Sequence, residues 1–132
     1  MIGIDTNVLV RFFVEDDPIQ TRKAARFMET RCTPEEPGFV DRVALCELVW
    51  VLSSGYGYRR PAITQVIDSL LASRDIVLED HESVRSALRV YERSGADFVD
   101  ALIGQINRAR GCEATVTFDR DAAKLAGFIR IS

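Results

Sequence analysis

The chain has 132 residues, of which 47% are hydrophobic and 28% are charged. This composition is typical of a single globular domain, here residues 1–132, and excludes a disordered or fibrous chain. With a formal net charge of -3, the chain lacks the overall basic character of most nucleic-acid-binding domains. No apolar run reaches the ~20 residues of a membrane span. The first residues do not resemble a secretory signal, and three cysteines without paired spacing favour a reduced, cytoplasmic protein.

Strands and helices alternate along the predicted chain. Short apolar runs mark the strands, and apolar residues at helical spacing mark the helices. In chain order we expect strand 1–4, helices 8–14 and 19–30, strand 38–40, a helix from 42 that is interrupted at 53–60, a helix from 61, strand 76–78, helices 83–93 and 100–110, strand 114–118, a short helix 119–125 and strand 128–131. Strands joined by helices imply right-handed crossovers. The pattern therefore predicts an α/β fold, a three-layer α/β/α sandwich with a central, mostly parallel sheet of four to five strands.

Local signals support several of these boundaries. Pro18 suits the first position of a helix, Asp41 is a good N-cap, and Gly111 is a typical helix stop. The helix from Pro61 carries one apolar face between Ile63 and Leu71. That face is either part of the core or the contact surface of a dimer.

Two aspartates follow predicted strands directly. Asp5 ends the first strand, and Asp119 ends the strand at 114–118. Because ligands of open parallel sheets bind outside the carboxyl ends of the strands, both side chains are candidates for one site. The alternative interpretation is that each only caps the helix that follows it.

Glu47 is flanked by apolar residues from Val43 to Leu52. A helix that is apolar nearly all round is expected to be buried, and a buried glutamate needs a cation or a proton. The alternative to a functional role is an ion pair with an arginine such as Arg11 or Arg42.

Asp97 and Asp100 lie three residues apart at the start of another predicted helix. Both could simply be an N-cap and a first-turn acid. Several carboxylates brought together repel one another, whereas Mg²⁺ prefers such oxygen ligands. A bound divalent ion could polarise a phosphoryl oxygen and activate water, so the acids favour hydrolysis of a phosphodiester.

Four segments of the chain carry these acids in a recognisable order. They are Ile4-Asp5-Thr6-Asn7-Val8-Leu9, Glu47 in its apolar helix, Asp97-Phe98-Val99-Asp100-Ala101-Leu102, and Thr117-Phe118-Asp119-Arg120. Together they resemble the PIN-domain ribonucleases and, more narrowly, the VapC toxins of bacterial type II toxin–antitoxin pairs. The resemblance covers the whole chain, and the four-part set is far more specific than Asp-Thr-Asn alone.

The resemblance implies a metal-dependent endoribonuclease that uses Mg²⁺ or Mn²⁺. By motif match, the catalytic and metal-binding acids are Asp5, Glu47, Asp100 and Asp119. The supporting polar residues are Thr6, Asn7, Asp97 and Thr117, with Asp121 a weaker candidate. The implied partners are an RNA substrate, a second copy of the chain in a homodimer, and a cognate antitoxin that covers the acidic groove. No membrane is implied.

Other interpretations of the same residues remain open. The protein could be a non-catalytic regulatory or interaction module with this fold. Asp5-Thr6-Asn7 also resembles a phosphoacceptor loop, although Asn7 stands where such phosphatases have a second aspartate. His81, the only histidine, is expected to lie in a solvated helix start, and Trp50, Phe39, Phe98 and Phe118 are expected to fill the core.

Overall fold

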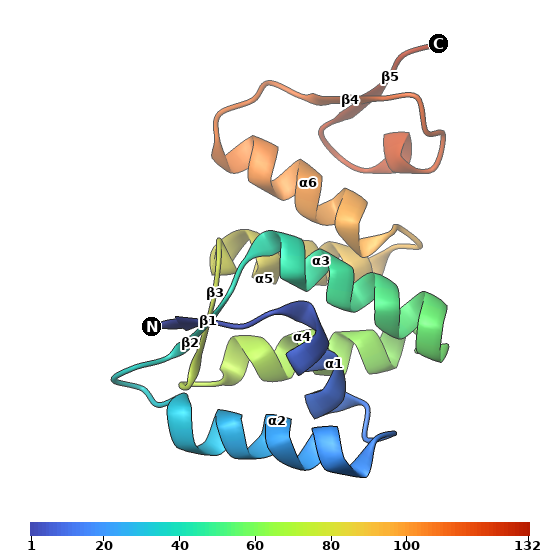
Figure 1. Cartoon of the computed structure of the whole chain (residues 1–132). Coiled ribbons are helices and arrows are strands. Elements are labelled where there is room, and N and C mark those ends of the chain that lie inside the picture. Colours follow the sequence, from blue (N-terminus) through green and yellow to red (C-terminus); the bar gives the residue numbers. More distant parts are fainter. The chain divides into compact units, whose positions relative to one another are not determined.

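The computed structural model describes residues 1–132, which fall into two units, Met1–Glu79 (unit 1) and Asp80–Ser132 (unit 2). The elements of unit 1, labelled in Figure 1, are β1 (Ile2–Gly3), α1 (Thr6–Phe13), α2 (Pro18–Arg31), β2 (Gly38–Val40), α3 (Arg42–Trp50), the π-helical turn η1 (Val51–Gly55), α4 (Arg60–Ala72) and β3 (Ile76–Leu78). Those of unit 2 are α5 (His81–Arg93), α6 (Phe98–Ala109), β4 (Thr115–Thr117), the 3₁₀ turn η2 (Ala122–Lys124) and β5 (Phe128–Arg130).

Every pair of neighbouring strands is parallel. Unit 1 contains a sheet of order β1-β2-β3, in which Gly38 pairs with both Ile2 and Ile76. Unit 2 contains the pair β4-β5, in which Thr115 is opposite Phe128. The α/β class with parallel strands is therefore confirmed. The five strands are divided between two sheets, where the sequence predicts one.

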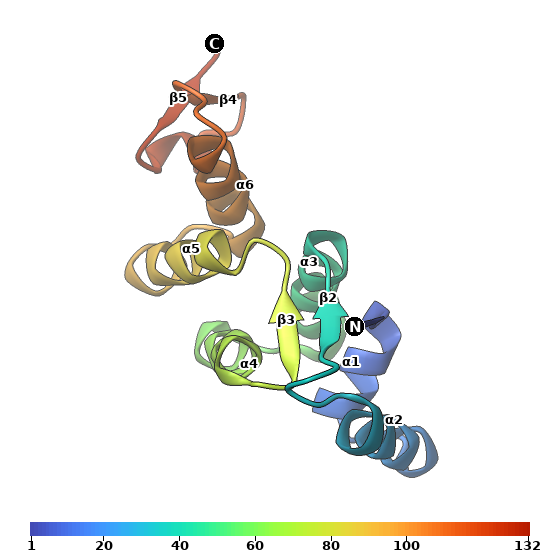
Figure 2. The same ribbon diagram turned by 90° about the vertical axis from the view of Figure 1, so that its left-hand side faces the viewer.

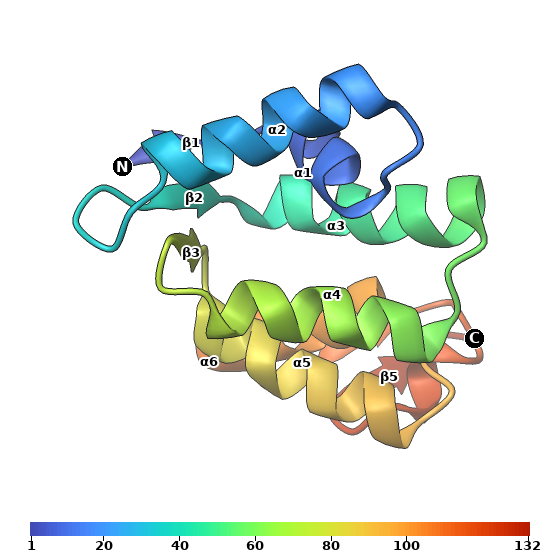
Figure 3. The same cartoon turned by 90° about the horizontal axis from the view of Figure 1, so that it is seen from below.

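Helices cover the sheet of unit 1 from different directions. Figure 2 shows β2 beside β3, with α4 next to β3 and with α1 and α2 toward the other end of the sheet. Figure 3 shows the same division from below. Helix α1 packs against both α2 and α3. It thus links the helices between β1 and β2 to the first helix between β2 and β3.

The core of unit 1 is built from aliphatic side chains of these helices and strands. Completely or almost completely buried members are Leu9, Val40, Leu45, Leu48, Leu52, Ile63 and Ile67. The apolar face of α4 is thus a core face, which decides between the two possibilities that the sequence left open. It offers no support for a dimer surface.

Capping explains most of the helix boundaries. Asp17 accepts hydrogen bonds from the Ile19 and Gln20 amides at 3.1 Å, and Pro18 opens α2 as predicted. Asp41 accepts from the Ala44 amide at 2.7 Å at the start of α3. Helix α6 ends before Gly111, whose positive φ of 87° suits glycine.

The helix that begins at Arg42 continues farther than predicted. Where the sequence predicts an interruption at 53–60, the backbone first widens into η1, and only the segment between η1 and α4 is irregular. The Ser53 hydroxyl donates to the Val49 carbonyl at 2.8 Å, which satisfies a carbonyl in the widened turn.

Unit 2 has its own core between α5 and α6. Tyr91 and Phe98 meet edge to face, with ring centroids 5.9 Å apart, and Val84, Leu88 and Leu102 pack in the same buried layer. None of the helices in either unit has the length and apolar character needed to cross a membrane.

Candidate functional site

Asp5 follows β1 and caps α1. Its Oδ1 accepts a hydrogen bond from the Thr6 amide at 2.8 Å, and its side chain is exposed. Because Asp5 is the N-cap of α1, the helix starts at Thr6 rather than at the predicted Val8. Only one carboxylate oxygen is used in this contact, so the other is open to a ligand.

Glu47 lies on the exposed side of α3, and the prediction that it is buried is wrong. Helix α3 buries Ala44, Leu45, Leu48 and Val49 on one side only. The opposite side of α3, which carries Glu47, is exposed to solvent, although the sequence of the helix is apolar nearly all round.

The ion-pair alternatives for Glu47 are also not seen. Arg11 pairs with Asp16 at 2.7 Å, and Arg42 pairs with Glu79 at 3.3 Å. The partner of Glu47 is a hydroxyl group: the Thr6 Oγ1 donates to Glu47 Oε1 at 2.8 Å.

Thr6 therefore connects the two acids of unit 1. Its amide donates to Asp5, and its hydroxyl donates to Glu47, which lies 41 positions farther along the chain than the threonine. This arrangement supports the prediction that Thr6 is a supporting polar residue. Asn7 is exposed and lines a cavity of about 680 Å³ together with Asp5.

The acids of unit 2 surround the start of α6. Asp97 caps the helix and accepts from the Val99 amide at 2.7 Å and the Asp100 amide at 3.2 Å. Asp100 lies half-buried in the first turn. Asp119 follows β4 and accepts from the Asp121 amide at 2.8 Å, while its own amide donates to the Thr117 hydroxyl at 3.0 Å.

Asp100 differs from the other acids in its electrostatics. Partial burial raises the pKa of this carboxyl, and the neighbouring charges of Asp97 and Asp119 raise it further. Asp100 takes part in no ion pair and accepts no hydrogen bond within the structure. A cation would relieve this repulsion, so the environment of Asp100 fits a metal ligand.

The predicted metal-binding acids come from both units, with Asp5 and Glu47 in unit 1 and Asp100 and Asp119 in unit 2. Neither unit alone gathers three acids, histidines or cysteines closely enough to hold an ion. The donor set nevertheless fits a hard divalent cation, because all four are carboxylates without a basic partner. Joint binding by the four acids stays a prediction.

Asp121 is occupied by another contact. Its carboxylate pairs with the Lys124 ammonium at 3.3 Å, and both side chains are largely exposed. Unlike the four predicted ligands, Asp121 therefore already has a cationic partner, which agrees with its weaker standing in the sequence.

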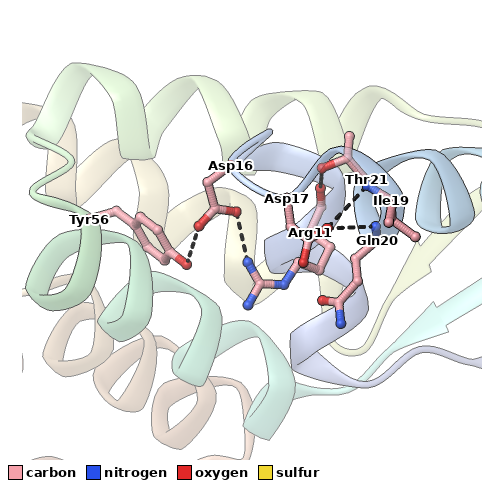
Figure 4. A network of polar contacts seen from close by, with 7 residues as sticks. All are labelled: Arg11, Asp16, Asp17, Ile19, Gln20, Thr21 and Tyr56. Atoms are coloured by element: carbon pink, nitrogen blue, oxygen red, sulfur yellow. Dashed lines mark hydrogen bonds and ion pairs between the residues drawn. The ribbon is translucent and has the colours of Figure 1, made fainter.

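A polar network at the far end of α1 was not predicted (Figure 4). Asp16 accepts from Arg11 at 2.7 Å and, through its other oxygen, from the Tyr56 hydroxyl at 3.1 Å. These hydrogen bonds and the charge of Arg11 outweigh partial burial and lower the pKa of Asp16. We call these three residues the Arg11–Asp16–Tyr56 clip. In the sequence, Asp16 lies between the helices predicted at 8–14 and 19–30, and Tyr56 lies in the interruption predicted at 53–60, so neither position indicates this contact.

Two aromatic side chains do not fill the core as expected. Trp50 is 67% exposed and Phe118 is 75% exposed, whereas Phe98 is buried. Trp50 shares the outer side of α3 with Glu47, and Phe118 directly precedes Asp119. His81 is exposed at the start of α5, as predicted.

Comparison with known proteins extends over nearly the whole chain. The family model for the PIN domain matches residues 2–128. A VapC ribonuclease of Aquifex aeolicus (strain VF5) is 28% identical over 123 residues, which cover 92% of this chain and 90% of that protein. Among solved structures, the Sarcin-Ricin loop cleaving toxin VapC20 of Mycobacterium tuberculosis is 20% identical, with a TM-score of 0.47, over 98% of this chain and 97% of that one.

Proposed function

The chain belongs to the PIN-domain family, and from that membership and its acidic residues we propose that it is a metal-dependent endoribonuclease, the toxin of a toxin–antitoxin pair. The family match over residues 2–128 carries the proposal, since it spans all four acidic motifs. The ribonuclease from Aquifex aeolicus supports the same activity and an RNA substrate.

The proposed metal ligands are Asp5, Glu47, Asp100 and Asp119, and the proposed ion is Mg²⁺ or Mn²⁺. When bound, such an ion polarises a phosphoryl oxygen and lowers the pKa of a bound water. The support from the structure is local. Asp5 and Glu47 share Thr6 as a hydrogen-bond donor, and Asp100 carries a raised pKa beside two like charges.

Three of the supporting residues, Thr6, Asp97 and Thr117, act on these carboxylates or on the backbone that carries them rather than on RNA. Thr6 holds one Glu47 oxygen and leaves the other available. Asp97 fixes the first turn of α6 and so the backbone that carries Asp100. Thr117 accepts from the Asp119 amide and fixes the turn after β4. Asn7 is exposed beside Asp5, where its amide can contact a phosphate.

The proposed partners follow from the relative's class. A cognate antitoxin neutralises the enzyme by covering the acidic residues, the active form is a homodimer, and the pair acts in the cytoplasm. Static light scattering of the purified chain tests the dimer. Nuclease assays of the complex test whether the antitoxin blocks the acids.

The central experiment is RNA cleavage by the purified chain with Mg²⁺ or Mn²⁺ and with EDTA. We expect cleavage that requires the metal and is lost in Asp100→Asn. Asp121→Asn is the matched control, because this acid already pairs with Lys124, and it should remain active. Cleavage that survives chelation would contradict the metal dependence. A protein that binds RNA without cutting it would favour the non-catalytic module.

A further inference from the structure

Helix α2 is strongly basic although the protein as a whole is acidic. The full chain has a formal net charge of -3. Helix α2, with the sequence PIQTRKAARFMETR, carries four basic residues and only one acid. Helix α2 therefore carries a local excess of positive charge that could attract a polyanion, although the net charge of the whole chain is negative.

These basic side chains point away from the core. Ala24 and Met28 are the buried residues of α2, whereas Arg22, Lys23 and Arg26 are exposed. None of the three forms an ion pair or a side-chain hydrogen bond. We call Arg22, Lys23 and Arg26 the basic face of α2.

The spacing of the basic face suits a phosphate backbone. Arg22 and Arg26 are four residues apart, which corresponds to a rise of about 6 Å along an α-helix. Successive phosphates of an extended single strand are separated by a similar distance. Arginine also binds phosphate oxygens through two parallel N–H donors, which lysine cannot do.

The basic face is continuous with the surroundings of Asp5. Lys23 lines the same cavity of about 680 Å³ as Asp5 and Asn7. Arg11 also lines this cavity, but its guanidinium is held by Asp16. Of the two basic residues that line the cavity, Lys23 is therefore the one that forms no ion pair with an acid. A polyanion lying on α2 would lead directly to Asp5.

We propose that the basic face of α2 binds the phosphodiester backbone of the RNA substrate and guides it toward Asp5. This inference rests on the proposed ribonuclease function and adds the surface on which the substrate lies. The binding is electrostatic and carries no base preference, since phosphate contacts position a strand without specifying its sequence.

Helix α5 provides an internal comparison. It exposes three arginines at intervals of four residues, Arg85, Arg89 and Arg93. The exposed side of α5, however, includes the acids Glu82 and Glu92, which offset much of the attraction for phosphate. Replacing Arg85 and Arg89 by glutamine therefore changes the net charge of the protein as much as replacing Arg22 and Arg26, but leaves the basic face of α2 intact.

The test compares Arg22→Gln/Arg26→Gln with Arg85→Gln/Arg89→Gln in the full chain. Binding of a short fluorescent single-stranded RNA is measured by anisotropy in EDTA over a range of salt concentrations. Each lost phosphate contact should reduce the slope of log K against log salt by about 0.7, so the α2 variant should lose about 1.4. At 0.1 M salt its affinity should fall on the order of tenfold. The α5 variant should keep most of its affinity.

Three outcomes would overturn the proposal. They are an unchanged slope in the α2 variant, an equal loss in the α5 variant, and no RNA binding by the wild type. Glutamine has a high helix propensity, and circular dichroism checks that both variants fold. Cleavage with Mg²⁺ is measured separately. Binding that depends on α2 without any cleavage would reject the ribonuclease function and leave the binding surface intact.

Discussion

The two units hold their candidate acids in opposite ways. In unit 1, Glu47 receives a hydrogen bond from the Thr6 hydroxyl at 2.8 Å, and the same threonine donates its amide to Asp5. In unit 2, Asp100 receives no such bond; its partial burial raises its pKa, and the neighbouring charges of Asp97 and Asp119 raise it further. The acids of unit 1 are thus held in place by hydrogen-bond donors, whereas Asp100 of unit 2 has no donor and lies beside like charges.

This difference separates two contributions to a metal site. A carboxylate fixed by a hydroxyl group keeps its orientation with or without an ion. A carboxylate surrounded by like charges gains most when an ion arrives, because the ion removes the repulsion. The acids of unit 1 should therefore set geometry, and Asp100 should contribute most to affinity.

Replacing Asp5 or Asp100 by asparagine should give the largest effects on activity. The stabilities of the two variants should also show how differently the two acids are held. Asp5→Asn and Asp100→Asn should each reduce RNA cleavage by at least about 100-fold, beyond the range usual for an outer partner of a metal ligand. Without metal, Asp100→Asn should melt at the same temperature as wild type or higher, since repulsion is lost. Asp5→Asn should melt as wild type does, because asparagine caps helices as well as aspartate.

Thermal melts of the metal-free proteins, read beside a cleavage assay, check both expectations. Asp121→Asn serves as the control for removal of an exposed acid with a basic partner. If Asp5→Asn and Asp100→Asn both remain active, the two aspartates are only helix caps and first-turn acids.

Metal binding should stabilise the wild type more than the variants. A ligand that binds only the folded state adds ~2.7 kcal/mol at a hundredfold excess over Kd. The melting temperature of the wild type should therefore rise with added Mn²⁺, and Asp100→Asn should lose most of this rise. An equal response in Asp100→Asn would show that the ion binds elsewhere.

Thr6→Val tests the role assigned to unit 1. Valine keeps the shape of threonine but cannot donate to Glu47, so kcat should fall by about tenfold, within the range of outer partners of metal ligands. The control is Thr30→Val, whose hydroxyl donates only to the Arg26 carbonyl within α2. A normal kcat in Thr6→Val would mean that the contact with Glu47 is only structural.

The raised pKa of Asp100 gives stability a defined pH dependence. The folded protein binds this proton more tightly than the unfolded chain does, so the carboxyl destabilises the fold once the pH exceeds its ordinary value of 3.8. The destabilisation reaches its full size once the pH is above the pKa of Asp100 in the folded protein. On acidification through that window, wild type should gain stability relative to Asp100→Asn. Urea unfolding of both proteins at neutral and mildly acidic pH measures the difference, and a constant difference would contradict the shift.

Sequence reasoning succeeded where a local rule was sufficient. Asp41 and Pro18 mark helix starts by capping chemistry, and β2 and β3 were predicted at their exact bounds. The order of acids in the motifs also pointed to the family that the comparison found.

The errors concern contacts between distant residues. Glu47 was expected to be buried because its neighbours in sequence are apolar, but α3 buries only one side. The Thr6 hydroxyl bridges 41 residues to Glu47, and Tyr56 bridges 40 residues to Asp16. The spacing of apolar residues along the sequence gives no indication of such long-range contacts. The exposure of Trp50 likewise depends on what α3 packs against rather than on side-chain type.

The Arg11–Asp16–Tyr56 clip should give the smallest effect, with a pH dependence opposite to that of Asp100. Tyr56→Phe removes one donor to Asp16 at a partly exposed site and should lower Tm by roughly 1–3 °C. Tyr58→Phe is the matched control, since the Tyr58 hydroxyl has no such partner.

The pKa of Asp16 is lowered in the folded protein, so its contribution to stability is present above 3.8 and is lost as the pH falls through the folded pKa. The difference between Tyr56→Phe and wild type should therefore shrink in acid, where Asp100 instead becomes less unfavourable. Melts of the three proteins at neutral pH and near pH ~3 check this. A Tyr56→Phe effect that is the same at both pH values would show that the hydroxyl does not act through the Asp16 carboxylate.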